Sequence, residues 1–170
     1  MMEQNRGRRF TFAVVTMSDK GSRGERQDTS GPYLCETLAG AGYEKVLYAM
    51  IPDSVERIVS LVRELADVKK VSLVLTTGGT GVAPTDVTPE AMLQVIDKEI
   101  PGIAEMMRLA SLEKTPNACL SRGKAGIRGT TLIVNLPGSL KAVRENLAIL
   151  LPVLSHALEK IHGDEGDCGR

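Results

Sequence analysis

The stretch from residue 71 to residue 90, VSLVLTTGGTGVAPTDVTPE, constrains the fold more than any other part of this chain. Four of its first five residues, Val71, Leu73, Val74 and Leu75, are apolar, which is typical of a central strand in a parallel sheet. Glycines and threonines follow directly: Thr77, Gly78, Gly79, Thr80 and Gly81. Thr88 is then predicted to cap a helix that has Pro89 at its first position. The pattern therefore predicts a buried strand, a glycine-rich turn and a helix, in that order.

The same alternation runs through the rest of the chain. Strands are predicted at 10–17, 46–51 and 130–136, with a more irregular strand between 120 and 129. Helices are predicted at 28–39, 54–68, 89–97, 101–112 and 139–162, the last of them kinked or divided by Pro152. Strands that alternate with helices pair in parallel and are covered on both faces. We therefore expect an α/β fold, a three-layer αβα sandwich around a mostly parallel central sheet.

The chain of 170 residues is predicted to form one domain at 10–163, between a flexible leader at 1–9 and a flexible tail at 164–170. Its three cysteines are odd in number and far apart, so they suit neither a disulfide framework nor a zinc site. Cys35 and Cys119 are expected to be buried thiols, and Cys168 to lie in the tail. Without a signal peptide or a membrane-length apolar run, we expect a cytoplasmic protein with no membrane partner.

Net charge and the number of histidines narrow the classes of function that this chain can have. Lys plus Arg and Asp plus Glu both number 21, so the formal net charge is zero. Because proteins that bind nucleic acid usually carry a basic excess, nucleic acid is not an expected partner. The chain has only two histidines, His156 and His162, and both fall on the last predicted helix, where structural roles are favoured. Chemistry based on a histidine is therefore disfavoured.

The glycine-rich turn is suited to an anion. Glycines let backbone N–H groups converge on a ligand, and threonine hydroxyls beside them can complete a phosphate site. The turn has neither the GK[ST] ending of a P-loop nor the glycine spacing of a dinucleotide-binding fingerprint. Asp86 follows this turn and Asp53 follows the preceding strand. Since parallel strands bring their carboxyl ends to one edge of the sheet, two carboxylates there predict a magnesium-assisted phosphoryl or nucleotidyl transfer.

Several segments together resemble one known family, that of molybdenum cofactor biosynthesis, which includes molybdopterin adenylyltransferases of the MogA type and the gephyrin G domain. The resemblance covers about residues 10–163 and is carried, in family order, by these segments: VTMSDKGSRGERQDTSGP (15–32), IPDS (51–54), LTTGGTGVAPTDVTPEA (75–91), EIPGIAEMMR (99–108), LSRGKAGIRGTTLIVNLPGS (120–139) and LPVLSHALEKIHG (151–163).

The resemblance implies a reaction and its residues. AMP would pass from ATP to the terminal phosphate of molybdopterin, with Mg²⁺ as cofactor and release of pyrophosphate. Asp53 and Asp86 would be the catalytic and metal-binding carboxylates. Phosphate or substrate would be bound by Thr77, Gly78, Gly79, Thr80, Gly81, Ser139, Ser18 and Asp19, with Glu105, Ser121, Arg122 and Lys141 as weaker candidates. A homotrimer, and transfer of product to a molybdate-insertion protein, are also implied.

Two other functions remain open from the sequence. A catalytically silent MoaB-type protein of the same fold would bind molybdopterin, or act as a scaffold, without turnover. A generic phosphate-binding hydrolase would consume ATP without any pterin. The presence of both Asp53 and Asp86 favours an active transferase over the first of these.

Overall fold

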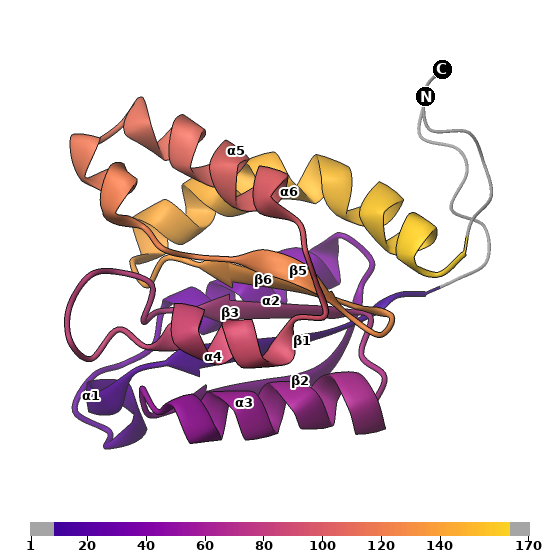
Figure 1. Ribbon diagram of the computed structural model, residues 1–170, viewed down its shortest axis with the longest axis horizontal. Coiled ribbons are helices and arrows are strands. Elements are labelled where there is room, and N and C mark those ends of the chain that lie inside the picture. Colours follow the sequence, from indigo (N-terminus) through magenta and orange to yellow (C-terminus); the bar gives the residue numbers. More distant parts are fainter. Residues whose placement is uncertain (1–8, 164–170) are drawn as a thin grey trace.

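A computed structural model describes residues 9–163. The predicted tail and, apart from Arg9, the predicted leader lie outside this range, as does Cys168. The described chain forms a central six-stranded sheet between two layers of helices (Figure 1). This confirms the predicted mostly parallel αβα architecture.

The sheet has the strand order β2-β1-β3-β6-β5-β4. Its parallel part consists of β1 (Thr11–Met17), β2 (Glu44–Ile51), β3 (Leu73–Thr77) and β6 (Thr131–Leu136). Two short strands, β5 (Ala125–Arg128) and β4 (Lys98–Glu99), extend it in antiparallel pairing. The irregular strand expected between 120 and 129 is β5, whereas β4, only two residues long, was not predicted.

Alternate residues of the strands pack against different helices, because neighbouring side chains of a strand point to opposite faces. On one face, Phe12, Val14 and Leu75 pack with α2 (Ser30–Gly40), α5 (Pro101–Leu112) and α6 (Leu140–Ile161). On the other face, Val15 and Val74 pack with α3 (Val55–Arg63) and α4 (Thr88–Val95). The two helical layers thus bury both faces of the parallel strands.

Some local features differ from the sequence predictions. The helix that begins after Ser54 ends as a π-helical turn, η1 (Glu64–Val68). A short helix, α1 (Asp19–Ser22), and a 3₁₀ turn, η2 (Pro116–Leu120), occupy segments in which no helix was predicted. The helix α6 continues through Pro152 without division, because residues on both sides of it, Leu150 and Leu154, are fully buried in the core and hold the two halves in line. Cys35 is half-buried, and Cys119, in η2, is exposed, so its predicted burial was wrong.

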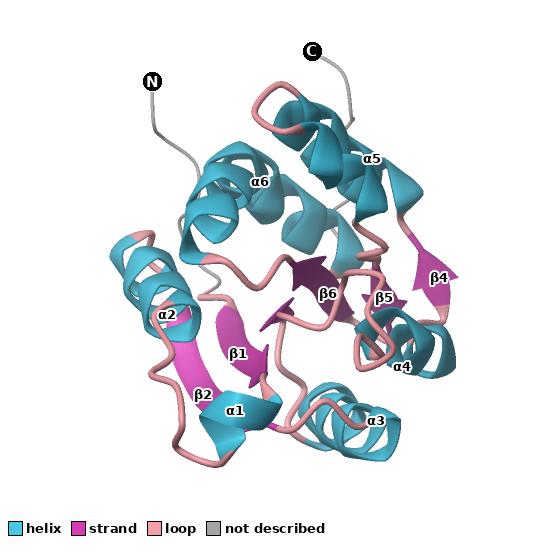
Figure 2. Ribbon diagram, turned by 90° about the vertical axis from the view of Figure 1, so that its left-hand side faces the viewer, coloured by secondary structure: helices cyan, strands magenta, loops and turns pink. Residues whose placement is uncertain are grey.

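The register of the parallel strands brings three loops to one edge. Thr77 of β3 lies opposite Thr16 of β1 and Leu136 of β6, so the three strands end at the same level. The next residues along each strand therefore enter loops at the carboxyl edge, which is turned to the viewer in Figure 2. This is the edge at which open α/β sheets bind their ligands.

Asp28 fixes the start of α2 against the sheet. Its Oδ1 accepts hydrogen bonds from the backbone N–H groups of Ser30 (2.9 Å) and Gly31 (3.1 Å). Its Oδ2 accepts from the hydroxyls of Thr16 in β1 (2.6 Å) and Tyr48 in β2 (2.8 Å). Burial alone would raise the pKa of Asp28, but these four donors outweigh burial and hold the pKa below its ordinary value. The ionised carboxylate is therefore part of the folded structure.

We expect Asp28→Ala to lower the free energy of unfolding by about 2–4 kcal/mol, because four donors lose a charged acceptor. Chemical denaturation of the two proteins measures the difference. The matched control is Glu36→Ala, an exposed carboxylate on the same helix, which should change stability by about 0.5 kcal/mol or less.

The effect of Asp28 should also depend on pH. A carboxyl group whose pKa is lowered on folding stabilises the protein above its unfolded pKa, and this contribution is lost as pH falls through the folded value. The stability difference between wild type and Asp28→Ala should therefore shrink in acid. A difference that stays constant from neutral pH to acid would contradict the role assigned to the ionised form.

Candidate functional site

The loop after β3 is shaped by two glycines with positive φ. Gly78 has a φ of 100° and Gly79 a φ of 62°, values that residues with side chains rarely adopt. The hydroxyl of Thr88 donates to the carbonyl oxygen of Gly78 at 3.0 Å, and the N–H of Thr88 donates to that of Gly79. Thr88 thus secures the loop rather than capping α4, since Val87 is the N-cap and Thr88 the first helical residue.

Asp53 is held by a reciprocal pair of hydrogen bonds to Asp19. The N–H of Asp19 donates to Oδ2 of Asp53 at 3.1 Å, and the N–H of Asp53 donates to Oδ1 of Asp19 at 3.0 Å. Asp19 follows β1 and Asp53 follows β2, so the pair joins two loops at the carboxyl edge. The other oxygen of Asp53 lies against Gly79, where a Cβ would approach Oδ1 to 2.8 Å. The fold therefore directs this carboxylate toward the glycine loop.

The surroundings of Asp53 disfavour its charge. Burial raises the pKa of the Asp53 carboxyl group, and the negative charges of Asp19 and Asp86 raise it further. The hydrogen bond from the N–H of Asp19 opposes this rise without cancelling it. A cation bound beside Asp53 would stabilise the ionised carboxylate and so offset the effects of burial and of the neighbouring negative charges.

Asp86 lies on the other side of the glycine loop. Its Oδ2 accepts a hydrogen bond from the N–H of Ala83 at 2.8 Å, and its own N–H donates to the carbonyl of Ala83 at 2.9 Å. A Cβ at Gly81 would stand 2.7 Å from Oδ2 of Asp86, so only glycine leaves room for the carboxylate there. The glycine loop is thus flanked by Asp53 near Gly79 and by Asp86 near Gly81.

Two cavities meet at this loop. The larger has a volume of about 510 Å³ and the smaller about 380 Å³. Four residues line both of them: Gly79, Asp86, Gly138 and Ser139. The shared boundary therefore contains one of the two flanking carboxylates and the start of α6, where Ser139 is the N-cap.

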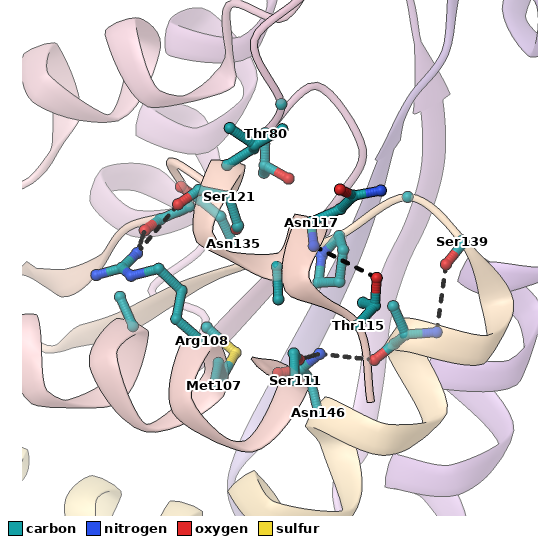
Figure 3. A pocket seen from close by; sticks show the side chains of 18 of the residues that line it. Thr80, Met107, Arg108, Ser111, Thr115, Asn117, Ser121, Asn135, Ser139 and Asn146 are labelled. Atoms are coloured by element: carbon teal, nitrogen blue, oxygen red, sulfur yellow. Dashed lines mark hydrogen bonds between the residues drawn. The ribbon is translucent and has the colours of Figure 1, made fainter. Parts of the chain in front are cut away.

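The larger cavity lies between the glycine loop, α5, η2 and α6 (Figure 3). Its wall is mostly apolar, with Ala104, Met107 and Leu120, but polar groups are distributed over it: Thr80, Arg108, Ser111, Thr115, Asn117, Ser121, Asn135 and Asn146. Asn135 is fixed in place, because its Nδ2 donates to the hydroxyl of Thr76 (2.8 Å) and its Oδ1 accepts from the N–H of Lys124 (3.1 Å). Such a cavity suits a heterocyclic ligand with several polar edges.

The smaller cavity is more polar. It lies at the ends of β1 and β2, and it is lined by Ser18, Asp28, Ser30 and Asp53 together with Gly78. Arg26 also lines it and brings a positive charge to a predominantly acidic wall. A ligand that carries phosphates and a cation would match this mixture of charges.

The structure brings most of the predicted site residues together. Ser18, Thr77, Gly78 and Asp53 line the smaller cavity, Thr80, Gly81 and Ser121 line the larger, and Gly79, Asp86 and Ser139 line both. Asp19 lines neither cavity but holds Asp53. The hydroxyl of Thr77 donates to the carbonyl oxygen of Pro137 at 2.7 Å, so it also has a structural function.

Three weaker candidates lie outside both cavities. Glu105 and Lys141 are exposed, on α5 and α6. Arg122 lines neither cavity but contacts the glycine loop, where its Nε donates to the carbonyl oxygen of Gly81. His156 and His162 also line neither cavity, and His162 packs its ring against Phe10.

Sequence reasoning did not identify Arg26, Arg108, Asn135 or Asn146 as cavity residues. Asn135 did leave a signal, because it is the one polar side chain between the apolar residues Leu132, Ile133, Val134 and Leu136 of a buried strand. Asn146 is 2% exposed on a helix face that is otherwise apolar. A polar residue within a buried apolar pattern was therefore the available indication.

Within residues 9–163, no group of three or more His, Cys, Asp or Glu residues is arranged to hold a metal ion. A magnesium site would not require such a group, since Mg²⁺ commonly takes one or two protein carboxylates and completes its shell with water and substrate phosphates. None of the helices in the same range combines the length and apolar character that crossing a membrane requires.

Comparison with known proteins gives consistent matches. The family model described as "Probable molybdopterin binding domain" matches residues 13–156. The molybdopterin adenylyltransferase of Helicobacter pylori strain J99 is 39% identical over 159 residues, which cover 90% of this chain and 88% of the relative. The molybdopterin adenylyltransferase of Escherichia coli K12 is 45% identical, covering 80% of this chain and 71% of the relative.

Other matches belong to longer proteins. The chain spans about a quarter of the molybdenum cofactor synthesis protein cinnamon of Drosophila melanogaster, with 42% identity and coverage of 26% of that protein. It also covers 23% of gephyrin from Dictyostelium discoideum, at 40% identity.

Among solved structures, the Thermus thermophilus molybdopterin biosynthesis enzyme MoaB superposes with a TM-score of 0.85 at 52% identity, covering 91% of this chain and 97% of that one. The Mycobacterium ulcerans Mog protein reaches the same TM-score at 38% identity, covering 89% of this chain and 99% of that one. Family model, sequence identity and superposition thus agree over nearly all of the described residues, and the chain belongs to the molybdopterin-binding domain family of molybdenum cofactor biosynthesis.

Proposed function

We propose that this protein is a molybdopterin adenylyltransferase, which transfers AMP from ATP to the terminal phosphate of molybdopterin and releases pyrophosphate. The observation that carries the proposal is the pair of carboxylates, Asp53 and Asp86, on either side of a glycine loop where two cavities meet. A reaction that joins two substrates needs two adjoining binding spaces with the reacting groups at their boundary. Relatives of similar length that carry this name support the assignment.

The chemistry requires little acid–base catalysis from the protein. An oxygen of the terminal phosphate attacks the α-phosphorus of ATP, and the bond from that phosphorus to the pyrophosphate oxygen breaks. Because a phosphate monoester is already anionic near neutral pH, no histidine is needed to remove a proton. The task of the protein is then to position the two phosphates and offset their mutual repulsion.

Three features of the chain serve that task. The positive φ at Gly78 and Gly79 turns the backbone of the glycine loop, so that N–H groups beyond that of Gly78, which donates to Leu136, can donate to phosphate oxygens. The 22-residue helix α6 begins beside Ser139 and directs its positive end to the boundary between the cavities. The mostly apolar wall of the larger cavity would reduce the water around the reacting groups once a ligand fills it.

The two carboxylates fit magnesium. Oxygen ligands are those Mg²⁺ prefers, and burial together with the negative charges of Asp19 and Asp86 raises the pKa of Asp53, an effect that a bound cation would offset. In this proposal Asp53 and Asp86 hold the ion, which would supply neutralisation of the phosphate charges when bound. The chain itself aims the carboxylates, through Asp19 for Asp53 and through Ala83 for Asp86.

The family assignment extends the proposal to the setting of the enzyme. We expect a homotrimer in the cytoplasm that passes its adenylylated product to a molybdate-insertion protein. A second function, binding of molybdopterin without turnover, is the MoaB-type alternative from the sequence, and a solved protein named MoaB is 52% identical to this chain. The two functions differ in whether the protein turns over ATP in the presence of molybdopterin.

The first test measures pyrophosphate release from ATP and Mg²⁺, with and without molybdopterin. We expect release that depends on molybdopterin and stops when a chelator removes the metal. Tight binding of molybdopterin without release would instead identify the silent relative, and release without molybdopterin would identify a nucleotide hydrolase.

In the same assay, Asp86→Asn and Asp53→Asn should each lower turnover by about 10²-fold or more, because each removes charge from the metal and phosphate site. The matched control is Asp67→Asn, a carboxylate that pairs with Arg128 away from both cavities and should leave turnover unchanged. Wild-type rates in both site variants would overturn the proposed mechanism.

Asp53→Asn should also raise thermal stability at neutral pH. A carboxyl group whose pKa is raised on folding opposes folding once it ionises, so its replacement by a neutral amide removes a penalty. The gain should disappear as pH falls below the Asp53 pKa, where wild type is also neutral. Thermal unfolding curves between neutral pH and acid check this, and equal stability at every pH would contradict it.

A further inference from the structure

A strap of three residues, Ser121, Arg122 and Gly123, joins helix α5 to the loop that carries the glycines and Asp86. On one side, Nη1 of Arg108 in α5 donates to the carbonyl oxygens of Ser121 (3.4 Å) and Gly123 (3.2 Å), and Figure 3 shows Arg108 beside Ser121. On the other side, Arg122 contacts the loop. The strap therefore fixes the distance between the wall of the larger cavity and the proposed catalytic loop.

Arg122 contacts this loop at several points. Its backbone N–H donates to the carbonyl oxygen of Thr80 at 2.8 Å. Its Nε donates to the carbonyl oxygen of Gly81 and its Nη2 to that of Asp86, both at 2.7 Å. Its guanidinium also pairs with the carboxylate of Glu90 in α4. One side chain thus joins the end of the glycine loop, the residue that carries the proposed catalytic carboxylate, and the helix that follows.

The two carbonyl contacts matter most for Asp86. Residues 82–85, between Gly81 and Asp86, are exposed, so few packing contacts hold this turn. The turn has its own hydrogen bonds between Ala83 and Asp86, which set its internal shape. Thr88 ties the end of this segment to Gly78 and Gly79, and the guanidinium, by bridging the carbonyl oxygens on both sides of the turn, sets how the turn itself stands against the glycine loop. Without that bridge this exposed turn would open more often, and the Asp86 carboxylate would lose its fixed position.

We propose that Arg122 is a positioning residue, which holds the Asp86 carboxylate in register with the glycine loop by bridging the carbonyl oxygens of Gly81 and Asp86. This inference rests on the proposed function for its catalytic consequence. Arg122 itself lines neither cavity, so it acts through the loop and not on a substrate. Lysine cannot replace it, because a single ammonium group lacks the planar set of donors that reaches three acceptors at once.

The test compares Arg122→Lys with the matched control Arg128→Lys. Arg128 also pairs with a carboxylate, that of Asp67, and donates to the carbonyl oxygen of Val95, but it is remote from both cavities. Arg122→Lys should lower kcat for pyrophosphate release by about 10²-fold, the loss typical of a misplaced catalytic group. Arg128→Lys should keep the wild-type kcat.

Two readouts separate positioning from a general loss of structure. Hydrogen exchange at the amides of Ala83 and Asp86 should become faster in Arg122→Lys and stay unchanged in Arg128→Lys. Asp86→Asn should cost far less in the Arg122→Lys background than in wild type, because the carboxylate is already displaced there. In the Arg128→Lys background its cost should be unchanged.

Several results would overturn the inference. It fails if Arg122→Lys keeps wild-type turnover, or if the losses from Arg122→Lys and Asp86→Asn simply multiply in the double variant. It also fails if exchange at Ala83 and Asp86 is unchanged. If the wild-type protein releases no pyrophosphate, the proposed function fails. The hydrogen-exchange experiment would still test whether Arg122 holds the turn that carries Asp86 in place. If Arg122→Lys does not fold, Glu90→Gln replaces it, since it weakens the guanidinium pairing alone and should speed exchange with a smaller loss of kcat.

Discussion

The shared level at which β1, β3 and β6 end is the constraint on which the site depends. The pairing of Thr16, Thr77 and Leu136 across the three strands brings to one edge three loops that are far apart in sequence. Gly78, whose N–H donates to the carbonyl oxygen of Leu136, continues this pairing one residue beyond the strands. A shift of register by one residue would reverse the faces of the buried side chains, so the core that fixes the sheet also fixes the site.

The site concentrates negative charge, and the fold compensates in different ways for different carboxylates. Asp28 receives four donors and is stable as an anion. Asp53 receives one backbone donor and faces other carboxylates, so its ionised form is disfavoured. The difference separates a carboxylate used to hold the structure together from one that remains available for a cation. Proteins commonly accept such local instability where a functional group is needed.

The fold was largely predictable because each strand and helix carries a local signal. The apolar runs at 12–15, 73–75 and 132–134 indicated buried strands, and Gly40 and Ser139 marked helix boundaries correctly. The short antiparallel β4 was not predictable, since two exposed residues, Lys98 and Glu99, carry no periodicity. Thr88 was mistaken for a cap, because its bond to Gly78 depends on a tertiary contact ten residues away.

For the site, sequence reasoning located the glycine loop and both carboxylates, because the loops of parallel strands converge. It did not find the wall of the larger cavity, which α5, η2 and α6 form from residues without a shared motif. Their convergence depends on how the helices pack, and packing leaves little trace in local sequence. The role of Arg122 likewise depends on carbonyl oxygens, which every residue has and no sequence pattern marks.

The absence of side chains at Gly79 and Gly81 limits how this protein could be adapted to other substrates. A methyl group at Gly79 would stand 2.4 Å from the hydroxyl of Thr88, and one at Gly81 would meet Asp86. Variation at these positions would therefore disturb the proposed phosphate site before it altered selectivity. The outer wall of the larger cavity has more freedom, since Asn117 and Leu120 are exposed. A directed-evolution library that aims at new heterocycles should accordingly be built there and leave the loop untouched.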